Sequence, residues 1–162
     1  MPPPRLERLE WVLLAYRLPR EPSTPRITVW RKLKRLGVSQ LLDGLVALPA
    51  DARTKEQLEW VADEVLEAGG EATVWLGRPG SMADERRIAA EMAAAAAQDY
   101  RAVVDEAEEL AEAEGGPHRR SILRLQRELQ RIDRRTFFPP PERDQAHRLV
   151  RRLAAQLEAA EL

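Results

Sequence analysis

Apolar and polar positions follow two different rhythms along the chain, and the change falls near residue 80. The first apolar run, residues 11–16, has apolar side chains on both of its alternating faces and predicts a strand buried on both sides of a sheet. A helix follows, capped by Ser23 or Thr24 and ending at Gly37. The apolar stripe of this helix consists of Val29, Trp30, Leu33 and Leu36.

The next segment predicts a hairpin and a second helix. Two short apolar runs within residues 38–49 surround Asp43-Gly44, a dipeptide that favours a two-residue hairpin turn. The capping-box pattern of Thr54 and Gln57 then predicts the start of the second helix. We expect the core stripe of that helix at Leu58, Val61, Val65 and Leu66.

A last strand at residues 72–76 completes the first half of the chain. The elements then run strand, helix, two-stranded hairpin, helix, strand. Because right-handed crossovers are strongly favoured, this order predicts an α+β fold with a ferredoxin-like βαββαβ domain over residues 1–80. The tryptophans of this half fall on predicted strands or helix stripes, where we expect them to pack in the core. They are Trp11, Trp30, Trp60 and Trp75.

After residue 80 the pattern is helical, which predicts a three-helix, all-α C-terminal region over residues 81–162. Ser81 caps a long helix through Ala113, and the last helix covers about residues 142–160. The middle helix carries an apolar seam formed by Ile122, Leu125, Leu129 and Ile132. Such a seam packs against a partner helix, either in the long helix of the same chain or in a second subunit. We therefore expect a homodimer that uses the helical region, the sheet or both.

Composition narrows the classes of protein. The chain has no cysteine, which excludes disulfides, thiolate metal ligands and a cysteine nucleophile. No apolar run approaches the ~20 residues that span a bilayer, and the proline-rich residues 1–10 lack the apolar core of a signal peptide. We therefore expect a cytoplasmic protein with no membrane partner.

The net charge of −1 conceals a strong segregation of charge. Residues 105–114 carry six acids and no base, whereas residues 119–135 carry seven arginines and two acids. In an antiparallel helical hairpin, Glu112 lies level with the first arginines of the second segment, Arg119 and Arg120, and neutralises them. Glu108 and Glu109 lie level with Arg124 in the same way.

Two basic clusters are candidates for binding DNA phosphates, because lysine and arginine release counterions there. The first is the exposed face of the first helix, with no acid between Glu21 and Asp43. The second is the end of the arginine-rich helix, where the pairing with acids runs out. The predicted DNA-binding residues are Arg26, Arg31, Lys32, Lys34 and Arg35 in the first cluster and Arg131, Arg134 and Arg135 in the second.

Four segments of the chain resemble the N-terminal domain of the chromate-resistance regulator ChrB. They are Trp11–Gly37, Gln40–Asp51, Glu71–Pro79 and Arg134–Pro140. The resemblance implies a cytoplasmic, chromate-responsive regulator of a chromate-efflux operon that acts on promoter DNA. Full-length members carry a second, C-terminal domain associated with chromate resistance, and this chain stops before it. The chain is therefore expected to be either a free-standing homologue or a fragment.

The first strand and helix are also similar to the ferredoxin-like domains of PaaX-type repressors and of CRISPR-adaptation nucleases. In those nucleases an aspartate that can bind the catalytic metal follows the tyrosine at the end of the first strand, and Arg17 stands there in this chain. A cation would repel a divalent metal, so metal-assisted hydrolysis is not expected. P-loop, dinucleotide-binding and nucleophile-elbow motifs are missing, and His118 and His147 are expected on the surfaces of basic helices. We predict a non-enzyme with no catalytic residue, metal or cofactor.

The start of the first helix is a separate candidate for binding an anion. Arg17, Arg20 and Arg26 converge in sequence on Ser23 and Thr24, where unpaired N–H groups and the helix dipole favour negative charge. Chromate and sulfate are tetrahedral dianions that suit such a site. The same arginines could instead anchor the proline-containing loop.

The leading functional prediction is a cytoplasmic transcriptional regulator of chromate resistance that binds DNA through basic helix surfaces. The alternative is a non-catalytic interaction or dimerisation module of a chromate-resistance system without direct DNA binding. Raising the salt concentration weakens phosphate binding steeply but affects an apolar interface little, so salt dependence distinguishes the two.

Overall fold

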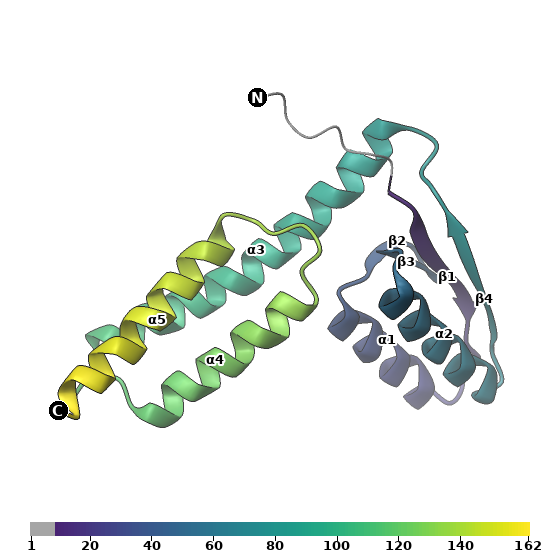
Figure 1. Cartoon of the computed structure of the whole chain (residues 1–162). Helices are drawn as coiled ribbons and strands as arrows, with labels where there is room; N and C mark the ends of the chain where they lie inside the picture. The colour runs from purple at the N-terminus through teal and green to yellow at the C-terminus, as the bar shows by residue number, and fades with distance from the viewer. Residues whose placement is uncertain (1–8) are drawn as a thin grey trace. The chain divides into compact units, whose positions relative to one another are not determined.

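The computed structural model describes residues 9–162, which form an α+β structure with a four-stranded antiparallel sheet and five helices (Figure 1). The proline-rich residues 1–8, which entered the signal-peptide prediction, lie outside the described part. The chain divides into two compact units between Ala89 and Ala90. We call residues 1–89 the sheet unit and residues 90–162 the helical unit.

The sheet has the strand order β2-β3-β1-β4, and every neighbouring pair is antiparallel. The strands are β1 (Trp11–Arg17), β2 (Ser39–Leu42), β3 (Leu45–Pro49) and β4 (Glu71–Gly77). The predicted hairpin is confirmed, because β2 pairs with β3 across the Asp43-Gly44 turn. The register of that pair shifts between Gln40 and Leu42.

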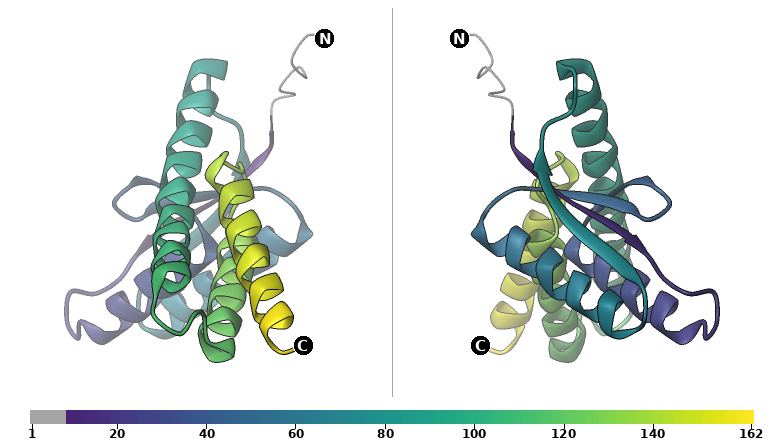
Figure 2. Two further views of the ribbon diagram at one scale, coloured as in Figure 1. Left: turned by 90° about the vertical axis from the view of Figure 1, so that its left-hand side faces the viewer. Right: turned by 90° about the vertical axis from the view of Figure 1, so that its right-hand side faces the viewer.

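Helices α1 (Thr24–Leu36) and α2 (Ala52–Glu67) lie on the same face of the sheet (Figures 1 and 2). Val12 and Leu14 of β1 point towards them and are fully buried. On the alternate face of β1, Trp11 is buried, while Leu13 is only half-buried. Burial of β1 is therefore complete on the helix face and partial on the other face.

The expectation that the four tryptophans pack in the core is wrong for three of them. Trp11 is 2% exposed, but Trp30, Trp60 and Trp75 are 38%, 62% and 59% exposed. Trp75 pairs in register with Leu13 and therefore shares the sheet face that α1 and α2 do not cover. Leu66, which was assigned to the core stripe of α2, is also exposed.

The start of α2 corrects the predicted capping box. Asp51 is the N-cap, and its carboxylate accepts a hydrogen bond of 2.7 Å from the Thr54 N–H. The Thr54 hydroxyl accepts one of 2.9 Å from the Asp51 N–H and contacts the Pro49 carbonyl oxygen at 2.7 Å. Thr54 is therefore the third helical residue and fully buried, so the box lies three residues earlier than Thr54 and Gln57.

The remaining helices are α3 (Met82–Glu112), α4 (Arg119–Arg134) and α5 (Glu142–Ala160). Ser81 caps α3 as expected, since its hydroxyl accepts a hydrogen bond of 3.1 Å from the Asp84 N–H. The first residues of α3 belong to the sheet unit. There Glu85 is buried and accepts hydrogen bonds from the Leu9 N–H at 2.9 Å and from the Trp11 indole N–H at 3.1 Å.

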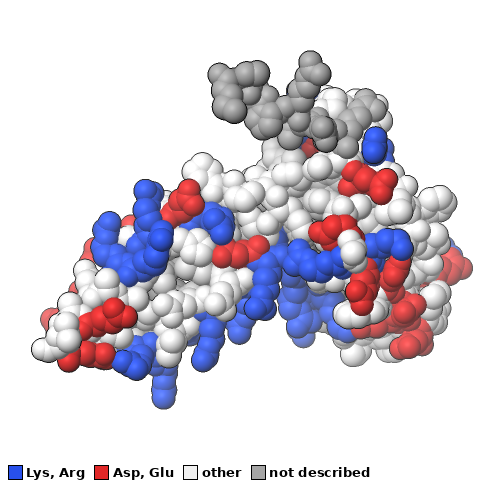
Figure 3. All heavy atoms as spheres, viewed as in Figure 1, with Lys and Arg blue, Asp and Glu red and all other residues white. Residues whose placement is uncertain are grey.

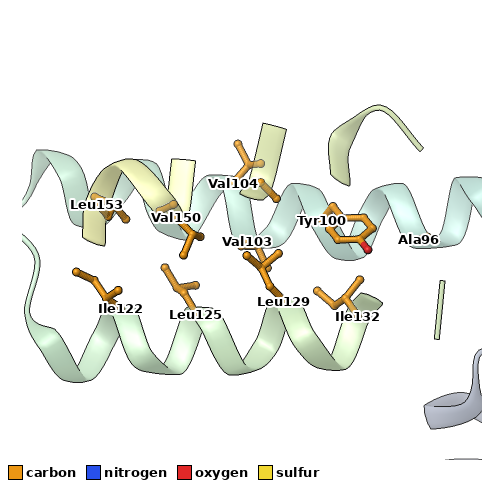
Figure 4. Packing of buried hydrophobic residues seen from close by; sticks show 12 residues of the cluster. Ala96, Tyr100, Val103, Val104, Ile122, Leu125, Leu129, Ile132, Val150 and Leu153 are labelled. Atoms are coloured by element: carbon orange, nitrogen blue, oxygen red, sulfur yellow. The ribbon is translucent and has the colours of Figure 1, made fainter. Parts of the chain in front are cut away.

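The helical unit has its own core, which the apolar seam of α4 forms with α3 and α5 (Figure 4). The four seam residues are at most 3% exposed. They point towards Tyr100 and Val103 of α3 and Val150 of α5. Of the two alternatives for the seam, packing within the same chain is therefore the one observed.

Candidate functional site

A pocket of about 720 Å³ opens in the sheet unit where α1 begins. Its walls come from the end of β1, the loop after it, the first two turns of α1 and the hairpin between β2 and β3. Three arginines and a serine line it, namely Arg17, Arg20, Arg26 and Ser23. These are four of the five predicted oxyanion-binding residues. The fifth, Thr24, is not a lining residue, and its carbonyl oxygen accepts a hydrogen bond from the Thr28 hydroxyl at 3.0 Å.

The hairpin turn is fixed against the end of β1 by its glycine. The carbonyl oxygen of Gly44 accepts a hydrogen bond of 2.8 Å from the Tyr16 N–H. Gly44 has φ +76°, and a Cβ at this position would lie 2.4 Å from the Tyr16 carbonyl oxygen. Only glycine fits this close approach without strain. The turn thereby holds Asp43 at the pocket beside Tyr16.

The pocket is predominantly positive. Arg17 forms a salt bridge of 2.9 Å with Glu71, and both side chains are about three-quarters exposed, at 77% and 76%. Arg20 and Arg26 are exposed and form no salt bridge within residues 9–162. Asp43 is the acid among the lining residues. Three guanidinium groups and one carboxylate leave an excess of positive charge that suits an anionic ligand.

Two aromatic side chains also line the pocket, and the sequence prediction did not include them. Burial raises the pKa of Tyr16, the charge of Asp43 raises it further, and Arg26 partly opposes both effects. The phenol is therefore neutral at physiological pH and can donate a hydrogen bond. Trp30 lines the same pocket, and the Lys34 ammonium lies 5.5 Å from the centroid of its ring.

The basic face of α1 is mostly exposed, as predicted for a DNA-binding surface. Arg31 and Lys34 face water and form no salt bridge in the described part of the chain. Arg35 is exposed, and its guanidinium contacts the Arg31 carbonyl oxygen at 3.4 Å. Lys32 differs, because it is half-buried and forms a salt bridge with Glu64 of α2.

The arginines of α4 are paired differently from the helical-hairpin prediction. Arg124 pairs with Glu106 rather than with Glu108 or Glu109. Arg119 pairs at 2.9 Å with Glu161 rather than with Glu112. The sequence prediction placed α4 opposite α3 only, whereas the end of α5 also lies within reach of the start of α4.

The three residues at the end of α4 predicted to bind DNA, of which Arg135 is the C-cap, have different surroundings. Arg131 contacts Glu128 at 3.4 Å on the helix surface. Arg135 pairs with Asp99 at 3.2 Å, and its side chain is only 23% exposed. Arg134 is exposed and has no salt bridge among residues 9–162.

A second, regularly spaced set of arginines on α4 shares the surroundings of Arg134. Arg120 and Arg127 are also exposed and unpaired within the described residues. Positions seven apart lie on one helix face, about 10 Å from one another along the axis. We call Arg120, Arg127 and Arg134 the arginine row. Two of them border a shallow groove of about 440 Å³ together with Leu123, and blue side chains project along α4 in Figure 3.

A polar cluster in the helical unit was missed by the sequence prediction. The Tyr100 hydroxyl donates to Asp133 at 2.6 Å, His147 Nε2 lies 3.0 Å from the same carboxylate, and Arg143 contacts it at 3.3 Å. His147 is therefore a half-buried hydrogen-bonding residue, not the surface histidine that we expected. A single aspartate in an arginine-rich helix gave no local signal of these partners.

Protonation in this cluster follows from burial and hydrogen bonding. Burial and the bond to Asp133 raise the pKa of Tyr100 to about 12. Burial also acts to raise the pKa of Asp133, but the hydrogen bonds from Tyr100 and His147 outweigh it and hold that pKa below its ordinary value. The carboxylate is therefore charged at physiological pH and joins α3, α4 and α5.

The described residues offer neither a metal-binding cluster nor a membrane-spanning helix. No group of three or more His, Cys, Asp or Glu side chains among them could hold a metal ion. None of the helices in residues 9–162 is both long enough and apolar enough to cross a membrane.

These features define an α+β protein whose sheet unit has a predominantly positive pocket and whose helical unit carries exposed arginines. The chain belongs to the family described as "Protein ChrB, N-terminal", whose model matches residues 26–161. This confirms the resemblance found in the sequence.

A curated relative is Protein ChrB of Cupriavidus metallidurans (strain ATCC 43123 / DSM 2839 / NBRC 102507 / CH34). It is 31% identical over 102 residues, which cover 63% of this chain and 28% of the relative. The chain thus matches less than a third of that protein's length. No solved structure matches the chain significantly.

Proposed function

We propose that this chain is a non-catalytic, cytoplasmic regulatory domain of a chromate-resistance system that binds DNA through the exposed cations of α1 and α4. Its membership of the ChrB family supports the assignment to a chromate-resistance system. The observation that carries the DNA binding is the arginine row, which has no acidic partner within the described residues.

We also infer that the sheet unit has the ferredoxin-like topology. The support is its element order, strand, helix, two strands, helix, strand, together with the sheet order β2-β3-β1-β4. The three helices α3, α4 and α5 then form the C-terminal region that the sequence predicts. In this topology the basic face of α1 points away from the sheet and is available to a partner.

The arginine row is suited to a phosphate backbone. Its guanidinium groups project from a rigid helix whose opposite side is anchored by the buried seam. The entropic cost of ordering upon binding is small, because the helix is already folded in the free protein. On α1, Arg31 and Lys34 offer two more cations of the same kind, and each phosphate contact adds to affinity and to salt dependence.

Charge-reversed variants test this proposal. We expect Arg120→Glu with Arg127→Glu and Arg134→Glu, or Arg31→Glu with Lys34→Glu, to weaken binding to a mixed-sequence duplex by more than tenfold at ~50 mM salt. The matched control is Arg119→Glu with Arg124→Glu, because these two arginines are already paired with acids. A wild-type chain that retains no DNA at this salt concentration would refute the proposal.

The alternative function, an interaction or dimerisation module, is supported by a different observation. Trp75, on the sheet face that α1 and α2 do not cover, is 59% exposed, and Trp60 and Leu66 of α2 are 62% and 52% exposed. Large exposed apolar side chains are common in protein interfaces. We propose a homodimer through this unit, since the seam of α4 is occupied within the chain. Light scattering of wild type beside Trp75→Ser tests it, and a strict monomer at high concentration would contradict it.

A further inference from the structure

We infer that the pocket at the start of α1 binds a nucleoside phosphate. A single tetrahedral oxyanion would fill a small part of its 720 Å³, a volume within the range of sites for drug-sized molecules. The lining is also chemically divided into a cationic part, an aromatic part and a part with hydrogen-bonding groups. A phosphate joined through a sugar to a planar base has these three parts.

The cationic part would hold the phosphate. Arg20 and Arg26 line the pocket, are exposed and form no salt bridge in the described chain. Each guanidinium can present a pair of N–H donors to phosphate oxygens. Ser23 lies between them in sequence, and its side chain makes no capping hydrogen bond to the helix. Its hydroxyl is therefore available as a further donor.

The aromatic part would hold the base. Trp30 lines the pocket and keeps 38% of its surface exposed, although a helix stripe normally buries such a residue. Ile27, one turn earlier on α1, lines the same wall and is 48% exposed. Stacking on an exposed tryptophan contributes strongly to the affinity for a base and tolerates every base type. The Lys34 ammonium at 5.5 Å holds the ring by a cation–π contact.

The third part combines donors with acceptors, and an ionised inorganic anion has no donor with which to use the acceptors. Gln40 supplies an amide, Tyr16 a neutral hydroxyl and Asp43 a carboxylate. A carboxylate disfavours a bare dianion by repulsion, but it accepts hydrogen bonds from amino groups of a base or from sugar hydroxyls. The presence of Asp43 therefore favours a nucleoside phosphate over chromate or sulfate.

Two kinds of ligand present a nucleoside phosphate: a free mononucleotide and an unpaired nucleotide within DNA. The two proposals share Arg26, which lines the pocket and was also predicted to bind DNA, but the arginine row and Arg31 are not among the lining residues. Variants of the row should therefore keep nucleotide binding intact. Loss of duplex binding and loss of nucleotide binding are separately measurable.

The first experiment measures thermal stabilisation and calorimetric binding of the wild-type chain at constant ionic strength. The probes are the four ribonucleoside 5′-monophosphates, ribose 5-phosphate and sulfate. A ligand that binds only the folded state raises the melting temperature. We expect each nucleotide to bind at least tenfold more tightly than ribose 5-phosphate or sulfate. Equal binding of nucleotide and sulfate, or no binding of any probe, would overturn the inference.

Substitutions then test which residues bind the phosphate of the ligand and which bind its base. Arg20→Ala with Arg26→Ala should weaken nucleotide and ribose 5-phosphate by at least tenfold. Trp30→Ala should reduce nucleotide binding to the level of ribose 5-phosphate and leave ribose 5-phosphate unchanged, while Trp30→Phe should retain most of the affinity. The controls are Trp60→Ala, a more exposed tryptophan outside the pocket at 62% against 38% for Trp30, and Arg31→Ala on the same helix as Trp30. An equal loss in Trp60→Ala would contradict the assignment.

A third arm distinguishes the two kinds of ligand. A DNA hairpin with one unpaired nucleotide is compared with a fully paired hairpin of the same length. Tighter binding of the former, abolished by Trp30→Ala and competed by free nucleotide, identifies an unpaired nucleotide of DNA as the ligand. Equal binding of the two hairpins, with nucleotide binding intact, identifies the free mononucleotide.

Discussion

The sheet unit and the helical unit differ in how far their large apolar side chains are exposed and in how often their basic side chains are paired with acids. In the sheet unit, three tryptophans, three leucines and one isoleucine among the described residues are exposed. In the helices of the helical unit, the exposed large apolar residue is Leu123. Conversely, the helical unit pairs many of its arginines with acids of other helices. The basic side chains of α1 are less often paired.

This difference follows from architecture. Each of three packed helices buries one stripe against its two neighbours and brings its polar flanks within salt-bridge distance of them. A sheet covered by helices on one face leaves its other face and its edge strand to solvent or to partners. The helical unit therefore forms its own core, and the sheet unit presents a pocket and apolar side chains that a ligand or another chain could cover.

The largest expected effect lies in the core of the helical unit. Leu125 is fully buried in the seam, and Leu125→Ala should reduce the unfolding free energy by about 2–5 kcal/mol. Leu123→Ala is the matched control, because Leu123 lies on the same helix and is 44% exposed. It should cost under about 1 kcal/mol.

Urea unfolding followed by two probes sharpens this comparison. The four tryptophans all lie in the sheet unit, so their fluorescence reports on that unit, whereas circular dichroism reports mainly on the helices. For Leu125→Ala we expect the circular-dichroism transition to move further than the fluorescence transition. Equal shifts of both transitions would show that the two units unfold as one.

The second effect concerns the hairpin turn that forms one wall of the pocket. Gly44→Ala should destabilise the sheet unit by about 2–3 kcal/mol, because the position has φ +76° and the new Cβ would overlap the Tyr16 carbonyl oxygen. Gly115→Ala is the matched change at φ +85° with nothing within 4 Å, and we expect it to cost about 1 kcal/mol. The melting temperatures of the two variants test this order.

The third effect is the dependence of the helical unit on pH. The pKa of Asp133 is lower in the folded chain than its ordinary value of 3.8. Its stabilising contribution is therefore complete above that ordinary value and is lost as the pH falls through the lower, folded value. Tyr100 affects stability at alkaline pH, because its pKa is raised from 10.0 to about 12. Its contribution is complete below 10.0 and is lost as the pH rises through about 12.

Asp133→Asn should cost about 1–2 kcal/mol at neutral pH and remove much of the acid-dependent loss. Asp105→Asn, an exposed aspartate on α3, is the control that should leave both properties unchanged. Melting temperatures between pH 2 and 8 measure the difference. An acid-dependent loss of the same size in Asp133→Asn and in wild type would show that other carboxylates cause it.

The smallest effect is expected for the exposed pairs between helices. Arg124 and Glu106 are 60% and 35% exposed, and solvent screens such pairs, so a double-mutant cycle with alanine should give a coupling of about 0.2–1 kcal/mol. A larger value would indicate that salt bridges contribute to the stability of the helical unit as much as individual core contacts do.

How much of the structure could be predicted depended on how local the signal was. The seam of α4 was predicted from periodicity alone, because each of its residues faces the core at helical spacing. The burial of Trp75 was predicted wrongly, because alternation along a strand does not indicate which faces of the sheet are covered. Thr54 was placed at the start of the capping box instead of its end, because Asp51, directly before the first helical residue, is the N-cap.

The same limit applies to the candidate site. Arg17, Arg20 and Arg26 were found because they are close in sequence to the start of the helix. Asp43 and its neighbours in the hairpin were missed as pocket residues, because they reach the pocket only through the contact between Gly44 and Tyr16. That contact joins segments nearly thirty residues apart, and no local pattern reports it.

The central claim, that exposed cations bind a phosphate backbone, is tested most directly by the salt dependence of binding to a mixed-sequence duplex. For wild type, the logarithm of the affinity should fall linearly with the logarithm of salt concentration. Arg120→Ala with Arg127→Ala and Arg134→Ala should reduce that slope by about three, one for each lost phosphate contact. A wild-type slope near zero, or a slope unchanged in the triple variant, would contradict the claim and favour an interaction module.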